Sequence, residues 1–391
     1  MVYLDNAATT KMKDSVLEKM LPYFTKNFGN ASSTYTTPGQ NARKGLSEAR
    51  ADVAKAIGAQ SGEIYFTSGG SEADNWAIKG VTLKNKKRGN HIITSTVEHH
   101  AVLHTCQFLE KQGFEVTYLP VDEYGMVSAE DVENTIKDTT VLVTIMFANN
   151  EIGTINPIKE IGAVCKKHGV LFHTDAVQAT GAVTIDVKDM NIDLLSMSAH
   201  KFHGPKGVGA LYIRKGVQIE NLIHGGAQES GKRATTENVA GIVGMAAALS
   251  DAVAHMEEKT KRITYLRDKL INGIEKSIPY CRLNGHREKR LPNNVSFCFR
   301  YIEGESLLLS LDIKGFVVSS GSACTSGSLD PSHVLLAIGL PHEIAHGSMR
   351  ATLSEFTTEE EIDEFIKTLG PIVQRLRDMS PLYEGVEKGK E

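Results

Sequence analysis

The sequence has no closely spaced cysteines, no excess of basic residues and no long apolar run. Its five cysteines form no CxxC pair, which argues against a disulfide framework or a zinc ribbon and favours a reducing compartment. A formal net charge of −4 gives no global basic field, so we expect no direct nucleic-acid partner. No stretch approaches the roughly 20 apolar residues of a membrane helix, and the first residues show neither the basic nor the apolar region of a signal peptide. We therefore expect a cytoplasmic globular enzyme that contacts no membrane.

What is present is the alternation typical of an α/β protein. Short β-rich apolar runs alternate with amphipathic segments, at residues 63–66, 91–94, 141–148, 170–174, 192–197 and 210–213. The run at 141–148 has almost no polar alternation, which predicts a central strand covered by helices on both faces. A charged helical stretch at 252–278 follows, and then further strands at 294–299 and 316–319. A chain of 391 residues is long for one core, so we expect two domains with their boundary in that stretch.

A lysine follows one of these strands within residues 196–207, SMSAHKFHGPKG. Lys201 comes after small residues and His200 and before a glycine-rich turn, an arrangement that holds one amine in a constrained position. An amine that forms a Schiff base needs such a position, together with a pKa lowered by desolvation or by a nearby cation. The alternative is that Lys201 and Lys206 are ordinary loop residues beside a tight turn.

Asp175 ends another apolar strand, 26 positions before Lys201. A buried carboxylate needs a cationic or hydrogen-bond-donating partner. A protonated pyridine nitrogen would supply the cation, and the pair would make the pyridine ring an electron sink. Alternatively, Asp175 caps the next helix, with Gln178 three positions later, as at ordinary helix N-termini.

Residues 66–75, FTSGGSEADN, form an expected strand, a glycine turn and the start of a helix. The free N–H groups of such a helix end can bind a phosphate. The segment matches neither GxxxxGK[ST] nor GxGxxG, so a small phosphate fits better than a nucleotide. A capped helix after a turn is the alternative.

Three histidines lie in residues 97–104, VEHHAVLH, just ahead of an expected helix. His100 and His104 have the i, i+4 spacing of some zinc ligands, but no cysteine pair accompanies them. We favour His99 as an aromatic group that stacks on a cofactor ring and moves protons. A hydrogen-bonded structural histidine remains the alternative.

Cys324 lies in residues 317–328, VVSSGSACTSGS, a run of small and polar residues. Of the five cysteines it has the least apolar surroundings, so we expect it to be exposed and mobile. A thiol in such a loop can reach a substrate and then carry the product away. A buried structural cysteine is the alternative, as expected for Cys298 among apolar neighbours.

In this order, the segments resemble the cysteine desulfurases of the NifS and IscS type, which are fold-type-I pyridoxal-phosphate enzymes of the class-V aminotransferase family. The resemblance extends from YLDNAATT at 3–10 to SMRATLS at 348–354, nearly the whole chain. It implies a large domain at 16–257 with a mostly parallel central sheet flanked by helices. Residues 1–15 and 258–391 would form a smaller α/β domain that carries the Cys324 loop and Arg350.

The resemblance also implies a role for each site residue. Lys201 resembles the Schiff-base lysine, Asp175 the partner of the pyridine nitrogen, and His99 the stacking acid/base. Arg350, helped by Asn150, is similar to the arginine that binds the substrate carboxylate. The other cofactor contacts would be Gly70, Ser71, Asn150, Gln178, Ser198 and His200, with Thr236 contributed by the second subunit of a homodimer.

The implied reaction takes sulfur from L-cysteine and leaves L-alanine. Lys201 is the expected base, and the Cys324 thiolate would attack the substrate sulfur to form a persulfide, with His99 assisting its deprotonation. The persulfide would pass to an acceptor, by resemblance an iron–sulfur scaffold, where Cys324 could transiently ligate a shared cluster. No metal site of the chain's own is expected.

Four positions depart from the family pattern. Ala227 and Thr235 replace the usual glycines, and Ala31 and Tyr35 replace the usual proline and histidine. Thr235 puts the geometry of the cross-subunit phosphate contact in question, and Tyr35 could alter the substrate entrance.

Two other functions would use the same segments. A lyase or aminotransferase, acting for example on selenocysteine or cysteine sulfinate, would keep Lys201 and Asp175 and leave Cys324 incidental. A non-catalytic scaffold or sulfur-relay protein would bind no cofactor.

Overall fold

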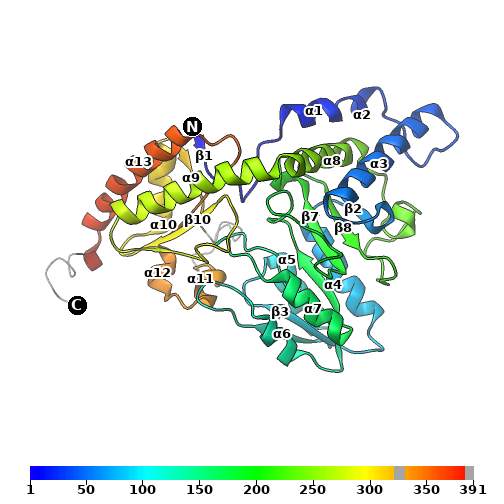
Figure 1. Ribbon diagram of the computed structural model, residues 1–391, viewed down its shortest axis with the longest axis horizontal. Helices are drawn as coiled ribbons and strands as arrows, with labels where there is room; N and C mark the ends of the chain where they lie inside the picture. The colour runs from blue at the N-terminus through cyan, green and yellow to red at the C-terminus, as the bar shows by residue number, and fades with distance from the viewer. Residues whose placement is uncertain (321–330, 384–391) are drawn as a thin grey trace.

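The computed structural model describes residues 1–320 and 331–383, and its central feature is a seven-stranded sheet (Figure 1). The strand order is β2-β8-β7-β6-β5-β3-β4. Strands β4, β3, β5, β6 and β7 run parallel, and β8 is antiparallel to both of its neighbours. The strands are β2 (Ile64–Thr67), β3 (His91–Ser95), β4 (Glu115–Leu119), β5 (Thr140–Thr144), β6 (Leu171–Asp175), β7 (Leu194–Ser198) and β8 (Gly209–Ile213). The expected mostly parallel sheet is therefore confirmed.

Helices cover both faces of this sheet. Alternate residues of each strand point to opposite faces, and apolar residues on both faces pack against helices. Leu142 and Leu194 pack on one face with the apolar side chains of α4 and α5. Val143 and Leu195 pack on the other face with those of α3, α7 and α8. The helices of this part are α1 (Asp14–Met20), α2 (Pro22–Thr25), α3 (Thr37–Ala56), α4 (Gly70–Lys84), α5 (His100–Glu110), α6 (Ala129–Thr135), α7 (Ile158–His168) and α8 (Val239–Ala254). Short 3-10 turns lie at η1 (Ser61–Glu63), η2 (Ala199–Lys201) and η3 (Glu229–Gly231).

A second, smaller unit is built around a three-stranded antiparallel sheet, in the order β12-β10-β9. Its strands are β9 (Cys281–Leu283), β10 (Asn294–Phe299) and β12 (Ser348–Thr352), and β1 (Val2–Tyr3) pairs in parallel with β11 (Phe316–Val317) beside it. Its helices are α9 (Met256–Ser277), α10 (Gly304–Ile313), α11 (His333–Ala337), α12 (His342–His346) and α13 (Glu359–Asp378). An apolar core of its own joins α9, α10 and α13 to this sheet. Figure 1 shows the long α9 extending from α8 across this unit.

Most of the expected strands lie within two residues of observed ones, but one is shorter than expected, and β1, β4, β9 and β12 were not expected. The strand expected at 141–148 ends at Thr144, and the chain turns at Asn149, which accepts the N–H groups of Glu151 and Ile152. Edge strand β4 was not expected, because its half-exposed residues give a weak pattern. The division at residues 16–257 stays a prediction.

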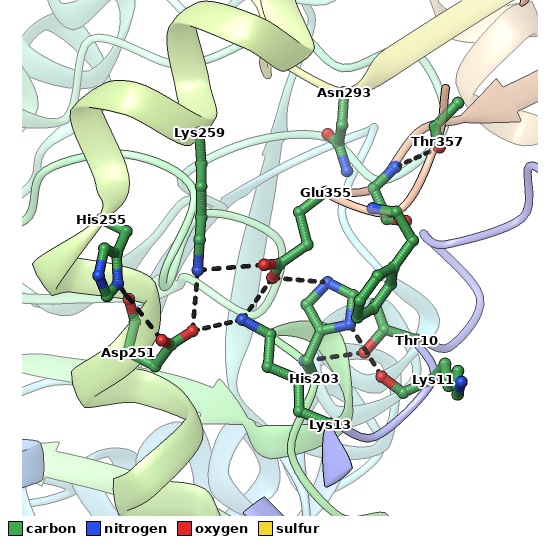
Figure 2. A network of polar contacts seen from close by, with 12 residues as sticks. Thr10, Lys11, Lys13, His203, Asp251, His255, Lys259, Asn293, Glu355 and Thr357 are labelled. Atoms are coloured by element: carbon green, nitrogen blue, oxygen red, sulfur yellow. Dashed lines mark hydrogen bonds and ion pairs between the residues drawn. The ribbon is translucent and has the colours of Figure 1, made fainter. Parts of the chain in front are cut away.

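A cluster of charged side chains joins the two units where the N-terminal segment passes between them (Figure 2). Lys13 contacts both Asp251 of α8 and Glu355, which follows β12. Lys259 of α9 contacts the same two carboxylates, at 2.8 and 3.3 Å. We call these four residues the junction cluster. His203 lies beside it, with Nε2 3.7 Å from Glu355 and Nδ1 2.8 Å from the carbonyl oxygen of Lys11.

Over residues 1–320 and 331–383, no single helix has both the length and the apolar character that a membrane span requires. Helices α8 and α9 meet that test only as a pair, and they are bent by 75° where they join. Most of α8 is buried against the sheet and against α3.

Candidate active site

One cavity of about 290 Å³ collects nearly all the residues expected from sequence. It lies at the carboxyl ends of β6 and β7, where open α/β sheets bind ligands. Its lining consists of Ala7, Ala8, Gly70, Ser71, Asp74, His99, Met146, Ala148, Asn150, Asp175, Val177, Gln178, Ser198, His200, Lys201 and Arg350. A larger hollow of about 1030 Å³ lies against the end of α13 and contains none of the expected residues. The smaller cavity is therefore the candidate site.

Lys201 ends the short turn that follows β7, and its amine points at the N-terminal segment. Its Nζ lies 2.5 Å from the carbonyl oxygen of Ala7 and 2.9 Å from that of Ala8. Gln178 donates to the same Ala7 carbonyl at 3.0 Å. The segment after β1 therefore forms one wall of the cavity and orients the lysine.

Asp175 is the last residue of β6, and only 6% of it is exposed. Its Oδ1 accepts the N–H of Val177 at 2.9 Å within a turn, and no helix lies among the described residues between β6 and β7, so Asp175 does not cap a helix. Burial raises the pKa of Asp175, and the charges of His99 and Lys201 counteract that effect. A buried carboxylate so placed favours a cationic ligand group.

His99 caps the N-terminus of α5, where its Nδ1 accepts the N–H of Ala101 at 3.1 Å. That bond leaves the proton of the neutral ring on Nε2. Burial lowers the pKa of His99, while Asp175 raises it. The ring is therefore a fixed, mostly neutral group that can donate from Nε2.

The N-terminus of α4 forms a polar cradle at the other end of the cavity. No side chain caps this helix end at Gly69. A Cβ on Gly70 would lie 2.6 Å from Val177, so the backbone approaches the cavity as closely as glycine allows. Ser71 and Ser198 add hydroxyls, and a helix N-terminus with such donors suits a phosphate.

His200 extends this cradle. Its Nδ1 lies 3.1 Å from Oγ1 of Thr9. Burial, and secondarily the charge of Lys201, lowers the pKa of His200 to about 4. The imidazole is therefore neutral at pH 7 and can serve as a hydrogen-bonding group without adding a charge.

Arg350 lies in β12 of the smaller unit and reaches the cavity from the opposite side. Its Nη1 donates to the carbonyl oxygen of Asn150 at 3.0 Å, and its Nη2 pairs with Asp5 at 2.9 Å. Its Nε is buried without a hydrogen-bond partner among the described residues. A buried arginine with an unused donor is suited to binding a carboxylate.

These groups fit pyridoxal phosphate. Lys201 offers the amine, Asp175 the buried carboxylate for the ring nitrogen, and His99 a flat ring. The uncapped end of α4 offers N–H groups for the phosphate, and the unpartnered Nε of Arg350 remains for a substrate carboxylate. Of these groups, the N-terminus of α4 has no side-chain cap, and the Nε of Arg350 has no hydrogen-bond partner among the described residues.

Two expected residues do not lie in the cavity. Thr236 is exposed on this single chain and is absent from the lining. Cys324 lies outside the described residues. Thr235, beside Thr236, adopts φ = +152°, a conformation that suits the family's usual glycine better than threonine. Of the other departures, Ala31 is buried, Ala227 is exposed and Tyr35 is almost fully exposed.

Three acidic residues of this region were missed from sequence: Asp5, Asp74 and Glu98. Asp74 lines the cavity one turn after Gly70, so its i, i+4 spacing from that glycine was the available signal. Asp5 meets Arg350 only through folding, because 345 positions separate them. Glu98 is buried directly before His99 and accepts the N–H of Met146 at 3.0 Å.

The histidines form a stack instead of a metal site. The rings of His100 and His104 are 5.0 Å apart, and His333 lies 4.8 Å from His100. Residues 342–346, HEIAH, have the HExxH spacing of zinc peptidases, which adds a second candidate. Nevertheless, within residues 1–320 and 331–383 no group of three or more His, Cys, Asp or Glu side chains is placed to hold a metal ion.

Comparison with known proteins gives matches over almost the whole chain. The family model for aminotransferase class-V matches residues 2–365. The chain is 62% identical to the cysteine desulfurase IscS of Clostridium botulinum, over 100% of this chain and 98% of that protein. It is 60% identical to the cysteine desulfurase IscS of Methanosarcina thermophila, over 97% and 94%.

Solved structures agree with these sequence matches. A NifS-like protein superposes with a TM-score of 0.90 at 42% identity, covering 96% of this chain and 100% of that one. A structure titled SspA in complex with cysteine superposes with a TM-score of 0.81 at 39% identity, covering 92% of this chain and 100% of that one.

Proposed function

The chain belongs to the class-V aminotransferase family, and we propose that it is a cysteine desulfurase that uses pyridoxal phosphate. It would convert L-cysteine to L-alanine and leave the sulfur as a persulfide on Cys324. The observation that carries this proposal is the cavity lined by Lys201, Asp175 and Arg350, whose Nε has no hydrogen-bond partner among the described residues. The full-length similarity to proteins named cysteine desulfurase supports it.

Different residues of the cavity would bind the ring and phosphate of the cofactor and the carboxylate of the substrate. Bound pyridoxal phosphate supplies an electron sink for the substrate α-carbon. Asp175 pairs with the ring nitrogen, and His99 lies against the ring. Gln178 and Asn150 donate near the ring hydroxyl, while Gly70, Ser71, Ser198 and His200 contact the phosphate. Arg350, with Asn150, binds the substrate carboxylate and orients the amino acid.

The reaction then requires proton transfer at the substrate α-carbon and transfer of the substrate sulfur to Cys324. Lys201 takes the proton from the substrate α-carbon and returns it during product formation. The thiolate of Cys324 attacks the substrate sulfur, so an S–S bond forms as the C–S bond breaks and its electron pair remains with the substrate carbon. His99 assists deprotonation of the thiol. Alanine then leaves, and the persulfide passes to an acceptor.

The proposal extends to partners. A homodimer would place Thr236 of each chain at the phosphate of the other. The sulfur acceptor would be a protein of iron–sulfur cluster assembly, where Cys324 could briefly ligate a cluster, and the enzyme would act in the cytoplasm. The printed name of the C. botulinum relative, cysteine desulfurase IscS, supports this assignment.

The test is to record the absorbance of the purified protein, add L-cysteine and assay alanine and sulfide. Wild type is compared with Cys324→Ala and with Cys281→Ala, a half-buried cysteine outside the cavity. We expect the visible absorbance of lysine-bound cofactor in all three, and equimolar alanine and sulfide that only Cys324→Ala loses. If Cys324→Ala turned over substrate as fast as wild type, the protein would instead be a lyase or an aminotransferase. No visible absorbance after addition of pyridoxal phosphate would refute the enzyme assignment.

A further inference from the structure

Asp74 is a second carboxylate in the candidate site, beside Asp175. It lies in the first turns of α4, is 1% exposed and lines the same cavity. Its Oδ1 is buried and has no hydrogen-bond partner among the described residues. An ionised carboxylate in such a position would lack most of the donors that a buried charge requires.

The neighbours of Asp74 supply little compensation. Among the described residues, the hydroxyl of Ser196 is the one side-chain group that lowers the pKa of Asp74. His173 lies closest among the cationic candidates, but its Nε2 is 3.7 Å from Oδ1. That imidazole is already bonded on both sides, to Thr144 at 2.8 Å and to Ser196 at 2.9 Å. Burial keeps it neutral, since it lowers the pKa of His173 to about 3.

The surrounding charges also disfavour ionisation of Asp74. Asp175 on β6 and Glu98 after β3 are both carboxylates that raise the pKa of Asp74 in addition to its burial. His99 and Lys201, which line the same cavity, lower the pKa of Asp175 and not that of Asp74. Two neighbouring buried carboxylates with one set of compensating charges hold one proton between them.

The proton belongs on the carboxylate with fewer partners. Asp175 has the N–H of Val177, the nearby charge of Lys201 and the ring of His99. Among the described residues, only the hydroxyl of Ser196 stabilises an ionised Asp74. We propose that Asp74 is a positioning residue that holds this proton beside Asp175 and thereby leaves Asp175 ionised toward the ring nitrogen. The cofactor-related part of this role rests on the proposed function.

The consequence is a division of roles between two similar side chains. If Asp74 were ionised, its repulsion would drive a proton onto Asp175, and Asp175 could no longer accept a charged N–H. With Asp74 neutral, the site presents one negative charge to one cationic ring nitrogen. An asparagine at position 74 imitates the neutral form, whereas an asparagine at position 175 removes the charge itself.

Infrared spectroscopy of the cofactor-loaded protein tests the proposal directly. We expect a protonated-carboxylic-acid band at pH 7.5 that shifts when aspartate is labelled with ¹³C, which separates it from Glu98. The band should disappear in Asp74→Asn and persist in Asp131→Asn, an exposed aspartate of α6. Absence of the band in wild type, or its survival in Asp74→Asn, would overturn the proposal.

The pH dependence of unfolding gives a second readout, opposite in sign for the two protonation states. A folded-state pKa above the unfolded value means that stability is full below the unfolded pKa and is lost as pH rises toward the folded pKa. Asp74→Asn should therefore raise the urea midpoint relative to wild type more at pH 8 than at pH 4.5. An ionised, merely hydrogen-bonded Asp74 predicts the reverse. Both readouts are independent of turnover, so an inactive protein could still confirm the shared proton.

Discussion

Partly buried charged groups are stabilised by their partners in the junction cluster, whereas burial destabilises the charged forms in the candidate site. In the junction cluster, two lysines and two carboxylates contact one another, and each partner favours the charged form of the other. Hydrogen bonds from Lys13 and Lys259 outweigh partial burial and lower the pKa of Asp251 to about 2. In the candidate site, burial dominates: it raises the pKa of Asp175 and lowers that of His99.

The difference separates a structural use of charge from a functional one. The charges of the junction cluster are satisfied within the protein and need nothing else to be stable. Those of the candidate site are incompletely satisfied, as the unpartnered Nε of Arg350 and Oδ1 of Asp74 show. Unsatisfied groups around a cavity are the groups that a ligand completes. Substitutions in the candidate site should therefore affect turnover, and those in the junction cluster should affect the free energy of unfolding.

The largest effect is expected for Lys201→Ala. Loss of the amine that moves the substrate proton should lower kcat by roughly 1000-fold, within the range for general acid–base groups. The fold should persist, because Lys201 lies in no core cluster. Steady-state kinetics and urea unfolding measure the two quantities. Lys206→Ala is the matched control, an exposed lysine of the same turn outside the cavity. Equal losses in both variants would remove Lys201 from the chemistry.

The next largest effect is expected for Lys13→Ala. This substitution should lower the stability of the protein and leave its turnover unchanged. Removal of this ammonium leaves Asp251 and Glu355 to share Lys259. We expect a loss of about 1–3 kcal/mol in the free energy of unfolding, less than for a fully buried pair because Asp251 is a third exposed.

Urea unfolding of Lys13→Ala should be compared with that of Lys19→Ala, an exposed lysine of α1. The control should remain near wild type. If Lys13→Ala instead lost turnover at unchanged stability, the junction cluster would belong to the active site.

The sequence predicts the two strand-end residues of the site better than their neighbours. Lys201 and Asp175 each follow an apolar strand, and parallel strands bring their carboxyl ends to one edge. Asp5 and Arg350 meet from opposite ends of the chain, so no local pattern contains their ion pair. The shared environment of Asp74 likewise depends on how α4 packs on β7.

The junction cluster was also beyond sequence reasoning, for the same reason. Lys13, Asp251 and Glu355 come from three distant segments, and single charged residues on helices usually face solvent. The HEIAH segment at 342–346 is the opposite case, a sequence motif that suggests a site which the described part of the fold does not complete. Its spacing suggests zinc, whereas the described residues provide no further ligand.

A comparable effect, but one that depends on pH, is expected for Glu98→Gln. Burial raises the pKa of Glu98 to about 8, above its unfolded value of 4.5. Its contribution to stability is therefore full below pH 4.5 and is lost as pH rises through 8. Glutamine cannot ionise, so the free energy of unfolding of the variant should rise by roughly 3 kcal/mol relative to that of wild type between pH 5 and pH 8. For Asp251, whose folded pKa is lowered, stability is instead lost as pH falls toward 2. Urea midpoints between pH 2 and pH 8 measure both slopes, and equal slopes would contradict the comparison.

The smallest effect is expected at the exposed pair Lys159–Asp189. Its two N–O distances are both 2.9 Å, as short as the contact of Lys259 with Asp251, but its side chains are 61% and 58% exposed. Water already solvates both groups, so the pair gains little from contact and salt screens what remains. Lys159→Ala should leave the urea midpoint unchanged within error at low and high salt. A loss as large as that of Lys13→Ala would mean that contact distance, and not partial burial with several partners, gives the junction cluster its strength.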